Sequence, residues 1–238
     1  MKVMVISGTS RGIGKYLSQY YLERNFIVCG CARANSSITH KNYRHFELDI
    51  SDEKAVISMI KNIQKEFKHI DILLNNAGIA SMNPILLTPL KSVENIFNVN
   101  FKGTFLLLRE VAKVMSLTSK KMQNPHFRIV NFATVATPLR LQGESIYAAS
   151  KAAIVNFSQI ASYELAPFSI TINCIAPTPI KTDLIKGVDE KKMNSLINRQ
   201  AIKRYGEFSD VSNAIDFFIN EKSDFITGQC LYLGGING

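Results

Sequence analysis

Tyr147 and Lys151 are four residues apart in the segment Tyr147-Ala148-Ala149-Ser150-Lys151. On a helix this spacing places both side chains on one face. A free tyrosine has a pKa of about 10 and is a slow base near neutrality, but a neighbouring ammonium group favours the phenolate and lowers that pKa. The pair therefore predicts proton transfer to or from an oxygen atom of a ligand. In isolation, a tyrosine and a lysine with this spacing are also common on a solvated helix face.

A glycine-rich segment near the start of the chain predicts phosphate binding. Its spacing is G-x-x-x-G-x-G rather than the G-x-G-x-x-G of the usual dinucleotide fingerprint. Glycines permit positive φ and a close approach of the backbone to a ligand, and the start of a following helix offers unpaired N–H groups to a pyrophosphate. A purely structural turn is the alternative. The residues predicted to bind a dinucleotide here are Ser7, Gly8, Ser10, Arg11, Gly12, Ile13 and Gly14.

Two arginines indicate whether the dinucleotide bound by this segment is NADP(H) or NAD(H). Arg11 lies inside the glycine-rich segment, and Arg33 follows the second apolar run. An acidic residue at the end of that run would bind a ribose 2′-hydroxyl, whereas an arginine suits a 2′-phosphate. Ala32 occupies the position where the acid is expected. The two arginines therefore favour NADP(H) over NAD(H).

The elements that must position these residues alternate along the whole chain. Apolar strand-like runs are separated by helix-length amphipathic segments, such as the one that carries Val56, Met59, Ile60 and Ile63 at helical spacing. We place the start of that helix at Ser51, with Lys54 three residues later. The predicted strands are 3–7, 26–31, 43–48, 70–75, 129–133, 171–175 and 230–233.

Strands separated by helices imply right-handed crossovers and a parallel sheet that is covered on both faces. The fold class is therefore α/β: one doubly wound Rossmann-type domain over residues 1–238, with a seven-stranded parallel sheet. In such a sheet, ligands bind beyond the carboxyl ends of the strands, where the strand order reverses. The candidate site residues above follow strands at that edge.

Composition narrows the class of protein further. Of the 238 residues, 46% are hydrophobic and 20% are charged, which is typical of a globular protein. The net charge of +9 comes from scattered lysines without interleaved aromatics, so we expect a basic solvated surface and no nucleic-acid partner. No apolar run reaches the length of a membrane span, and the opening run is too short for a signal peptide. We expect a cytoplasmic location and no membrane association.

The four cysteines show no metal-ligand spacing. They lie in strand-like apolar runs, and we expect buried free thiols and no metal site. These residues are Cys29, Cys31, Cys174 and Cys230.

Several further motifs share the order and placement of a known family. They are Leu48-Asp49-Ile50, Asn75-Asn76-Ala77-Gly78, Asn100, Tyr147-Ala148-Ala149-Ser150-Lys151, Pro177-Thr178-Pro179-Ile180-Lys181-Thr182 and Ile226-Thr227-Gly228-Gln229. Together with the glycine-rich segment, they make the chain resemble the short-chain dehydrogenase/reductase family over its whole length. The resemblance implies an NADP(H)-dependent oxidoreductase that reduces a carbonyl group or oxidises an alcohol, with Tyr147 as general acid and base.

The resemblance also implies roles for individual residues. Lys151 would hold the nicotinamide ribose, and Asn100 would support Lys151 through a water in a proton relay. Asp49 and Ile50 would flank the adenine. The remaining cofactor contacts that it implies are Asn76, Ala77, Gly78, Pro177, Ile180 and Thr182.

One departure from the family falls at a catalytic position. The family places a serine thirteen residues before the tyrosine, and this chain has Thr134 there. Threonine keeps the hydroxyl donor that polarises a carbonyl oxygen. Its β-branch stiffens χ1 and adds a methyl group near the substrate. We assign Thr134 the role of the serine, with a structural strand-end threonine as the alternative.

The substrate is left open by the sequence. The general resemblance is to 3-oxoacyl-thioester reductases, but residues 166–169 lack the basic residue that carrier-protein substrates often meet. A substrate lid is expected at about 183–206, where apolar residues mix with lysines that include Lys186. Arg140 and Glu144 are candidates to face a polar substrate. A sugar, a cyclic ketone and an acyl chain all remain open.

A protein that senses NADP without turnover is the alternative of another class. The intact set of Asn100, Tyr147 and Lys151 argues against it. The family resemblance also implies a homotetramer, or a homodimer, built from two long helices near 95–116 and 145–165.

Overall fold

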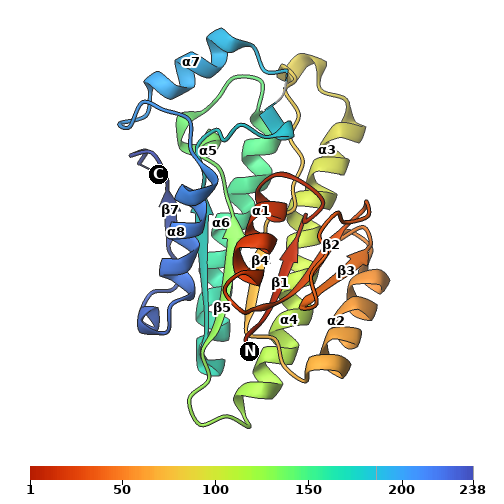
Figure 1. Cartoon of the computed structure of the whole chain (residues 1–238). Helices are drawn as coiled ribbons and strands as arrows, with labels where there is room; N and C mark the ends of the chain where they lie inside the picture. The colour runs from red at the N-terminus through yellow and green to blue at the C-terminus, as the bar shows by residue number, and fades with distance from the viewer. Residues whose placement is uncertain (186, 238) are drawn as a thin grey trace.

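The computed structural model describes residues 1–185 and 187–237. Seven parallel strands form one sheet in the order β3-β2-β1-β4-β5-β6-β7, as Figure 1 shows. The predicted α/β fold with a seven-stranded parallel sheet is therefore confirmed. The strands are β1 (Val3–Ser7), β2 (Ile27–Ala32), β3 (Tyr43–Glu47), β4 (Ile72–Asn75), β5 (Phe127–Phe132), β6 (Ile170–Ala176) and β7 (Cys230–Tyr232).

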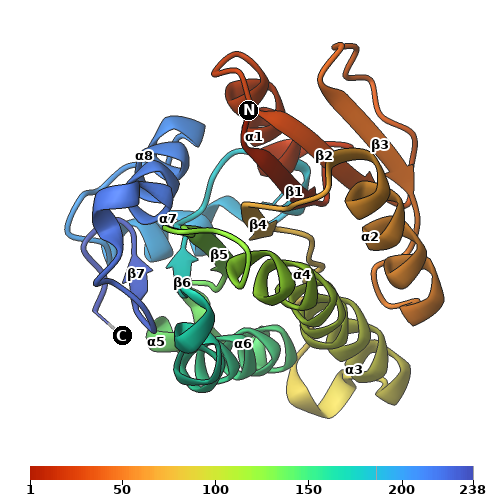
Figure 2. The ribbon, with the colours of Figure 1, turned by 90° about the horizontal axis from the view of Figure 1, so that it is seen from below.

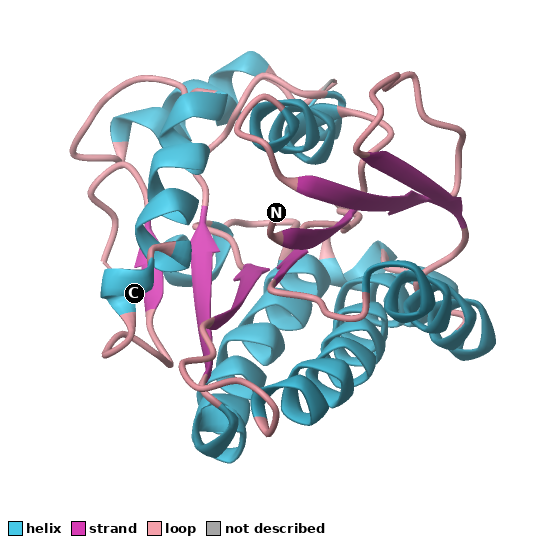
Figure 3. Ribbon diagram, turned by 60° about the horizontal axis from the view of Figure 1, so that its bottom comes forward, coloured by secondary structure: helices cyan, strands magenta, loops and turns pink. Residues whose placement is uncertain are grey.

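Helices cover both faces of this sheet. The longer helices are α1 (Gly12–Leu22), α2 (Glu53–Phe67), α3 (Leu90–Phe97), α4 (Gly103–Ser119), α6 (Ser145–Leu165) and α8 (Phe208–Ile219). Figure 2 shows α1 and α8 on one face and α2, α4 and α6 on the other, and Figure 3 shows helices on both sides of the sheet. Each face has its own apolar core, because every central strand is buried on both sides. No helix in the described part of the chain is long and apolar enough to cross a membrane.

The carboxyl ends of the strands meet at one edge of the sheet. Strand order reverses between β1 and β4, because the chain moves outward to β3 and returns to the other side of β1. Above this edge lie the short helix α5 (Ala136–Leu139) and α7 (Glu190–Asn198) (Figure 1). This arrangement opens a crevice where the predicted site residues end their strands.

The start of α2 differs from the prediction. Asp52, not Ser51, is the N-cap, and its carboxylate accepts hydrogen bonds from the backbone N–H groups of Lys54 and Ala55. The hydroxyl of Ser51 instead donates to the carboxylate of Asp49 at 2.7 Å. A carboxylate next to the helix N-terminus also gains from the positive end of the helix dipole.

The long helix expected near 95–116 is interrupted. A π-helical turn, Asn98–Lys102, separates α3 from α4. Such turns are rare and occur frequently at functional sites. This one carries Asn100, whose side chain is fully buried.

The cysteine prediction is correct in part. Cys29, Cys31 and Cys174 are buried free thiols, whereas Cys230 on the edge strand β7 is only half-buried. The difference arises because an edge strand has a neighbour on one side alone.

Candidate active site

The turn between β1 and α1 is built from close backbone contacts. Gly8 and Gly12 have φ of +77° and +55°, a region that side chains disfavour. A Cβ atom at Gly14 would lie 2.2 Å from the carbonyl oxygen of Gly8, so only glycine fits this first turn of α1. The side-chain amide of Asn76 donates to the carbonyl oxygen of Ser7 at 2.9 Å and fixes the turn from the end of β4.

Ser7 has a structural place in this region. Its hydroxyl is buried and accepts a hydrogen bond from the backbone N–H of Ala77 at 3.0 Å. This bond ties the end of β1 to the end of β4. Ser7 lies behind the cavity wall, and its side chain shapes the turn rather than lining the space above it.

The N-terminus of α1 is open to an anionic ligand. Arg11 is its N-cap residue, with no side-chain hydrogen bond to the helix and no acidic residue in the first turn. The first N–H groups of a helix have no partner inside the helix, and its dipole favours negative charge there. Gly12 and Ile13, the first residues of α1, line the cavity, so the donor set fits a pyrophosphate.

Arg11 and Arg33 both line the adjoining part of the cavity. The Arg11 side chain is 73% exposed and lies 3.7 Å from the Asp183 carboxylate, a distance at which it remains free to turn to a ligand. Arg33 is exposed beyond Ala32 at the end of β2. Burial raises the pKa of nearby Asp49, but hydrogen bonds from Ser51 and the charges of Arg33 and Lys102 outweigh it and hold that pKa below its usual value.

Lys151 is almost completely buried at the other end of the crevice. It is 3% exposed, and its ammonium group donates to the carbonyl oxygen of Phe132 at 2.7 Å. Burial lowers the pKa of Lys151 to about 8. The acceptor is the last residue of β5, a contact that no sequence motif signals because it uses the main chain.

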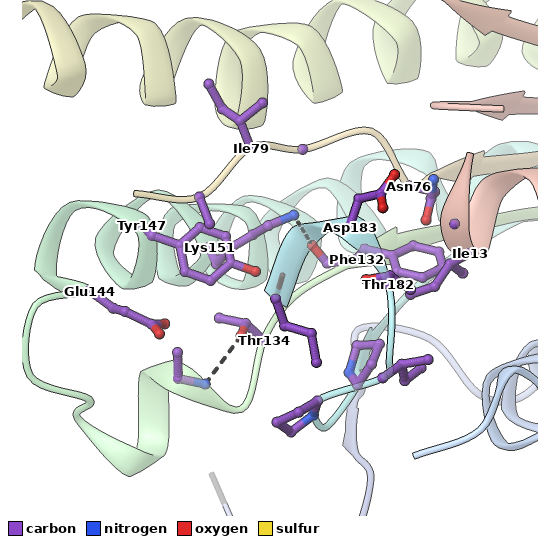
Figure 4. A pocket seen from close by; sticks show the side chains of 18 of the residues that line it. Ile13, Asn76, Ile79, Phe132, Thr134, Glu144, Tyr147, Lys151, Thr182 and Asp183 are labelled. Carbon is purple, nitrogen blue, oxygen red and sulfur yellow. Dashed lines mark hydrogen bonds between the residues drawn. The ribbon is translucent and has the colours of Figure 1, made fainter. Parts of the chain in front are cut away.

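Tyr147 lies one turn before Lys151 on α6 and faces the same cavity (Figure 4). Burial raises the pKa of Tyr147 to about 12, while the hydroxyl of Thr134 lowers it and the charge of Glu144 raises it. Lys151 is not among the causes of this shift, and the lowering expected from its ammonium group stays a prediction for the protein with its cofactor bound. At the pH where Tyr147 ionises, Lys151 has already lost its proton and offers no charge.

Asn100 is hydrogen-bonded to Ile79 and to Ser150, the residue before Lys151. Its side-chain amide donates to the carbonyl oxygen of Ile79 at 3.0 Å and to the hydroxyl of Ser150 at 2.9 Å, and its oxygen accepts from the Ile79 N–H at 2.8 Å. A Cβ atom at Gly78 would lie 3.3 Å from both the Asn100 oxygen and the Lys151 nitrogen. The π-helical turn thus places Asn100 beside Gly78, which also adjoins the Lys151 ammonium group, and Asn100 does not line the cavity.

Thr134 lies across from Tyr147, two residues after β5 ends (Figure 4). It is 8% exposed, and its hydroxyl oxygen accepts a hydrogen bond from the Ala136 N–H at 3.2 Å. That bond uses the oxygen as acceptor and leaves its hydrogen free to donate into the cavity. Thr134 and Tyr147 therefore present two hydroxyl donors to one region.

One continuous cavity of about 1270 Å³ joins these parts. Ser7, Gly14 and Asn100 support its wall without lining it. The predicted residues that line it are Gly8, Ser10, Arg11, Gly12, Ile13, Arg33, Asp49, Ile50, Asn76, Ala77, Gly78, Thr134, Tyr147, Lys151, Pro177, Ile180 and Thr182. Apolar residues that the sequence did not single out complete the wall, because only the fold brings their loops together: Ile79, Met82, Leu139 and Leu141.

The segment expected to act as a lid contributes α7 to this wall. The guanidinium group of Arg199, just after α7, donates to the carbonyl oxygen of Leu139 at 2.7 Å. Leu196 packs in an apolar cluster with Leu139, so the same helix has a polar and an apolar contact to α5. Lys186, named in the lid prediction, lies outside the described residues.

Comparison with known proteins places this geometry in a family. A family model described as "Enoyl-(Acyl carrier protein) reductase" matches residues 8–236. The 3-oxoacyl-(acyl-carrier-protein) reductase FabG of Escherichia coli strain K12 is 28% identical over 98% of this chain and 96% of its own length. The solved structure "ElxO with NADP Bound" is 30% identical, with a TM-score of 0.87 over 98% of this chain and 96% of that one.

A second solved structure, "4-hydroxyisoleucine dehydrogenase complexed with NADH", is 28% identical and has a TM-score of 0.90 over 100% of this chain and 99% of that one. The chain therefore belongs to the short-chain dehydrogenase/reductase family of oxidoreductases, as its motifs predicted.

Proposed function

We propose that this chain is an NADP(H)-dependent oxidoreductase that reduces a ketone to an alcohol, or catalyses the reverse, with Tyr147 as general acid and base. The observation that carries the proposal is the convergence of Tyr147, Lys151 and Thr134 on one cavity that also reaches the open N-terminus of α1. Proton donors and an anion site on a single wall suit a substrate and a dinucleotide bound side by side.

The cofactor half of the cavity supports a phosphorylated dinucleotide. The N–H groups at Gly12 and Ile13 would hold the pyrophosphate, and Arg11 and Arg33 would bind a 2′-phosphate. A nicotinamide cofactor supplies the hydride when it is bound. The related ElxO structure contains NADP and the 4-hydroxyisoleucine dehydrogenase structure contains NADH, so the arginines of this chain are the argument for NADP(H).

The remaining cofactor roles follow from position on the same wall. Asp49 and Ile50 would flank the adenine, and Lys151 would hold the nicotinamide ribose. The other proposed contacts are Asn76, Ala77, Gly78, Pro177, Ile180 and Thr182.

Proton transfer is assigned to Tyr147. With a pKa of about 12 in the cofactor-free protein, its hydroxyl is protonated at neutral pH and can donate to a substrate carbonyl oxygen. Thr134 donates a second hydrogen bond to the same oxygen and stabilises the charge that develops there. In the oxidation direction Tyr147 accepts the proton, and Lys151 and Asn100 with a bound water would replenish or remove it.

A 3-oxoacyl thioester is the first substrate class to test, since the E. coli relative carries that activity in its name. A sugar or a cyclic ketone is the alternative, which the polar groups Arg140 and Glu144 in the cavity wall support. The segment 183–206 would act as the substrate lid, with Arg199 and Leu196 as its contacts to α5.

A homotetramer, or a homodimer, and a cytoplasmic location are further parts of the proposal. Helix α6 exposes Ile160 at 55% and Tyr163 at 84%, large side chains that a second copy of the chain would cover. Sedimentation velocity of the purified protein tests this, and a monomer at all concentrations contradicts it.

The decisive experiment follows NADPH and NADH oxidation with a panel of 3-oxoacyl thioesters, diketones and keto-sugars. We expect turnover with NADPH that falls by about 10²- to 10⁴-fold in Tyr147→Phe, the usual contribution of a general acid. NADPH binding without turnover of any substrate would favour the alternative of an NADP sensor.

A further inference from the structure

Glu144 is a carboxyl group in the wall of the active-site cavity that has no side-chain partner among the described residues. It precedes α6 at the N-cap position, but its side chain makes no hydrogen bond to the helix. Instead it lines the cavity, and Figure 4 shows its carboxyl group beside Tyr147 and pointing toward Thr134. Within residues 1–185 and 187–237, no side chain forms an ion pair or hydrogen bond with this carboxyl group.

The described arginines and lysines of this wall form no ion pair with Glu144. Arg140, Lys191 and Lys192 line the same cavity without an ion pair to Glu144, and Arg199 donates to the Leu139 carbonyl oxygen. Burial raises the pKa of Glu144, which is the cost of keeping a half-buried carboxyl group without a partner. A carboxyl group kept at such a cost in a cleft is a candidate for ligand recognition.

A carboxyl group in this position can accept hydrogen bonds from a polar ligand, whereas an apolar ligand offers it no hydrogen-bond donor. A plain acyl chain beside the reacting carbon would bury Glu144 against methylene groups and leave it without a partner. A hydroxyl or ammonium group beside that carbon would satisfy it.

We infer that Glu144 determines substrate specificity by accepting a hydrogen bond from a hydroxyl or ammonium group of the substrate next to the reacting carbonyl. This inference rests on the proposed function, since it concerns the substrate of the same site. It favours a hydroxylated or aminated ketone over an unsubstituted 3-oxoacyl chain.

The test compares ketones of equal shape that differ in one group. The protein with NADPH is assayed on 3-hydroxybutan-2-one, 3-aminobutan-2-one and 3-methylbutan-2-one, and kcat/KM for each polar ketone is divided by that for the methyl ketone. A hydroxyl group also activates a ketone chemically, and this raises the ratio in every variant alike. The test of Glu144 is therefore the change of the ratio between the wild type and each variant.

We expect the hydroxyl ratio to fall by about tenfold or more in Glu144→Leu, as for a lost hydrogen bond to a charged group. Glu144→Gln keeps an acceptor oxygen, so it retains most of the hydroxyl preference but loses the ammonium preference. Glu23→Leu removes an exposed carboxylate just after α1, outside the cavity, and leaves both ratios unchanged. Equal ratios in the wild type and Glu144→Leu, or an equal loss on all three ketones, would overturn the inference.

Binding separates this inference from the proposed function. Calorimetric titration of the NADP⁺-loaded protein with butane-2,3-diol and with 3-methylbutan-2-ol gives the same comparison without turnover. A diol preference that disappears in Glu144→Leu upholds the inference even when no ketone is reduced, in which case only the proposed function fails. Equal affinity for the two alcohols, or binding of neither, overturns the inference.

Discussion

At the proposed phosphate end of the cavity the glycine turn contributes main chain to the wall, whereas at the proposed substrate end side chains carry the functional groups. The turn from Ser7 to Gly14 is held by contacts to backbone atoms, with a site at Gly14 that has no room for a Cβ atom. Opposite it, Thr134, Glu144 and Tyr147 present their own functional groups to the cavity. The two ends thus differ in what a single substitution can change.

The difference has a physical origin. A dinucleotide pyrophosphate is the same in every reaction, and N–H groups at a helix start bind it whatever the side chains are. A substrate is distinguished by donors and acceptors in particular places, and only side chains supply these. Substitutions in the glycine turn should therefore disturb binding and folding together, whereas substitutions at Thr134 or Tyr147 should change chemistry with little effect on stability.

The sharpest test of the side-chain end is Thr134→Val, which keeps the shape and removes the hydroxyl. Loss of one donor to the developing oxyanion lowers kcat by about 10²- to 10³-fold. Steady-state kinetics with saturating NADPH measures this effect. Thr134→Ser keeps the donor and should retain activity, whereas a Thr134→Val variant as active as Thr134→Ser would assign Thr134 to structure alone.

The corresponding test of the main-chain end is Gly14→Ala. The new Cβ atom would lie 2.2 Å from the Gly8 carbonyl oxygen, so the turn must shift. We expect the free energy of unfolding in urea to drop by about 2–3 kcal/mol, together with weaker NADPH binding.

Gly187→Ala is the matched control for Gly14→Ala. Gly187 has a φ of +91°, unlike the helical Gly14, and among the described residues other than its chain neighbours no atom lies within 4 Å of its Cβ position. Gly187→Ala should therefore lower the free energy of unfolding by about 1 kcal/mol, because only the left-handed backbone disfavours the alanine. Equal stability of the two variants would show that the packing at Gly14 does not control the turn.

Lys151 predicts a dependence of stability on pH. Its pKa is about 8 in the folded protein and 10.5 ordinarily, so the unfolded chain binds the proton more tightly between these values. Burial of the charge destabilises the fold fully below pH 8, and this cost disappears as pH rises toward 10.5. In Lys151→Met the cost is absent at every pH.

The measurement is the free energy of unfolding of the wild type and Lys151→Met across this range. Between pH 7.5 and 10.5, the free energy of unfolding of the wild type should rise by about 3 kcal/mol relative to that of Lys151→Met. A difference that stays constant with pH would mean that Lys151 keeps its ordinary pKa in the folded protein.

The smallest expected effect concerns the exposed arginines. Arg33→Ser should reduce the preference for NADPH over NADH by about tenfold, because it removes one charged hydrogen bond to a 2′-phosphate. Arg24→Ser, at an exposed arginine after α1, serves as control. Fluorescence titration with each cofactor gives the two ratios, and an unchanged preference in both Arg33→Ser and Arg11→Ser would remove the basis for NADP(H).

Much of the fold and the site was predictable because it depends on local rules. The strands came from apolar runs, and their ends shifted by one or two residues because hydrogen bonding in the sheet, not apolarity, sets where a strand stops. The start of α2 at Asp52 instead of Ser51 was missed for a similar reason, since both are good caps and the contact of Ser51 with Asp49 decides between them.

The sequence by itself determined which residues can do the chemistry: glycines where only glycine fits, and Tyr147 with Lys151 on one face of a helix. Tertiary structure alone decided their states. Burial lowers the pKa of Lys151 and raises the pKa values of Tyr147 and Glu144, which all line the cavity. The burial of a side chain depends on which distant segments pack against it, so the local spacing of residues in the sequence does not predict these pKa shifts.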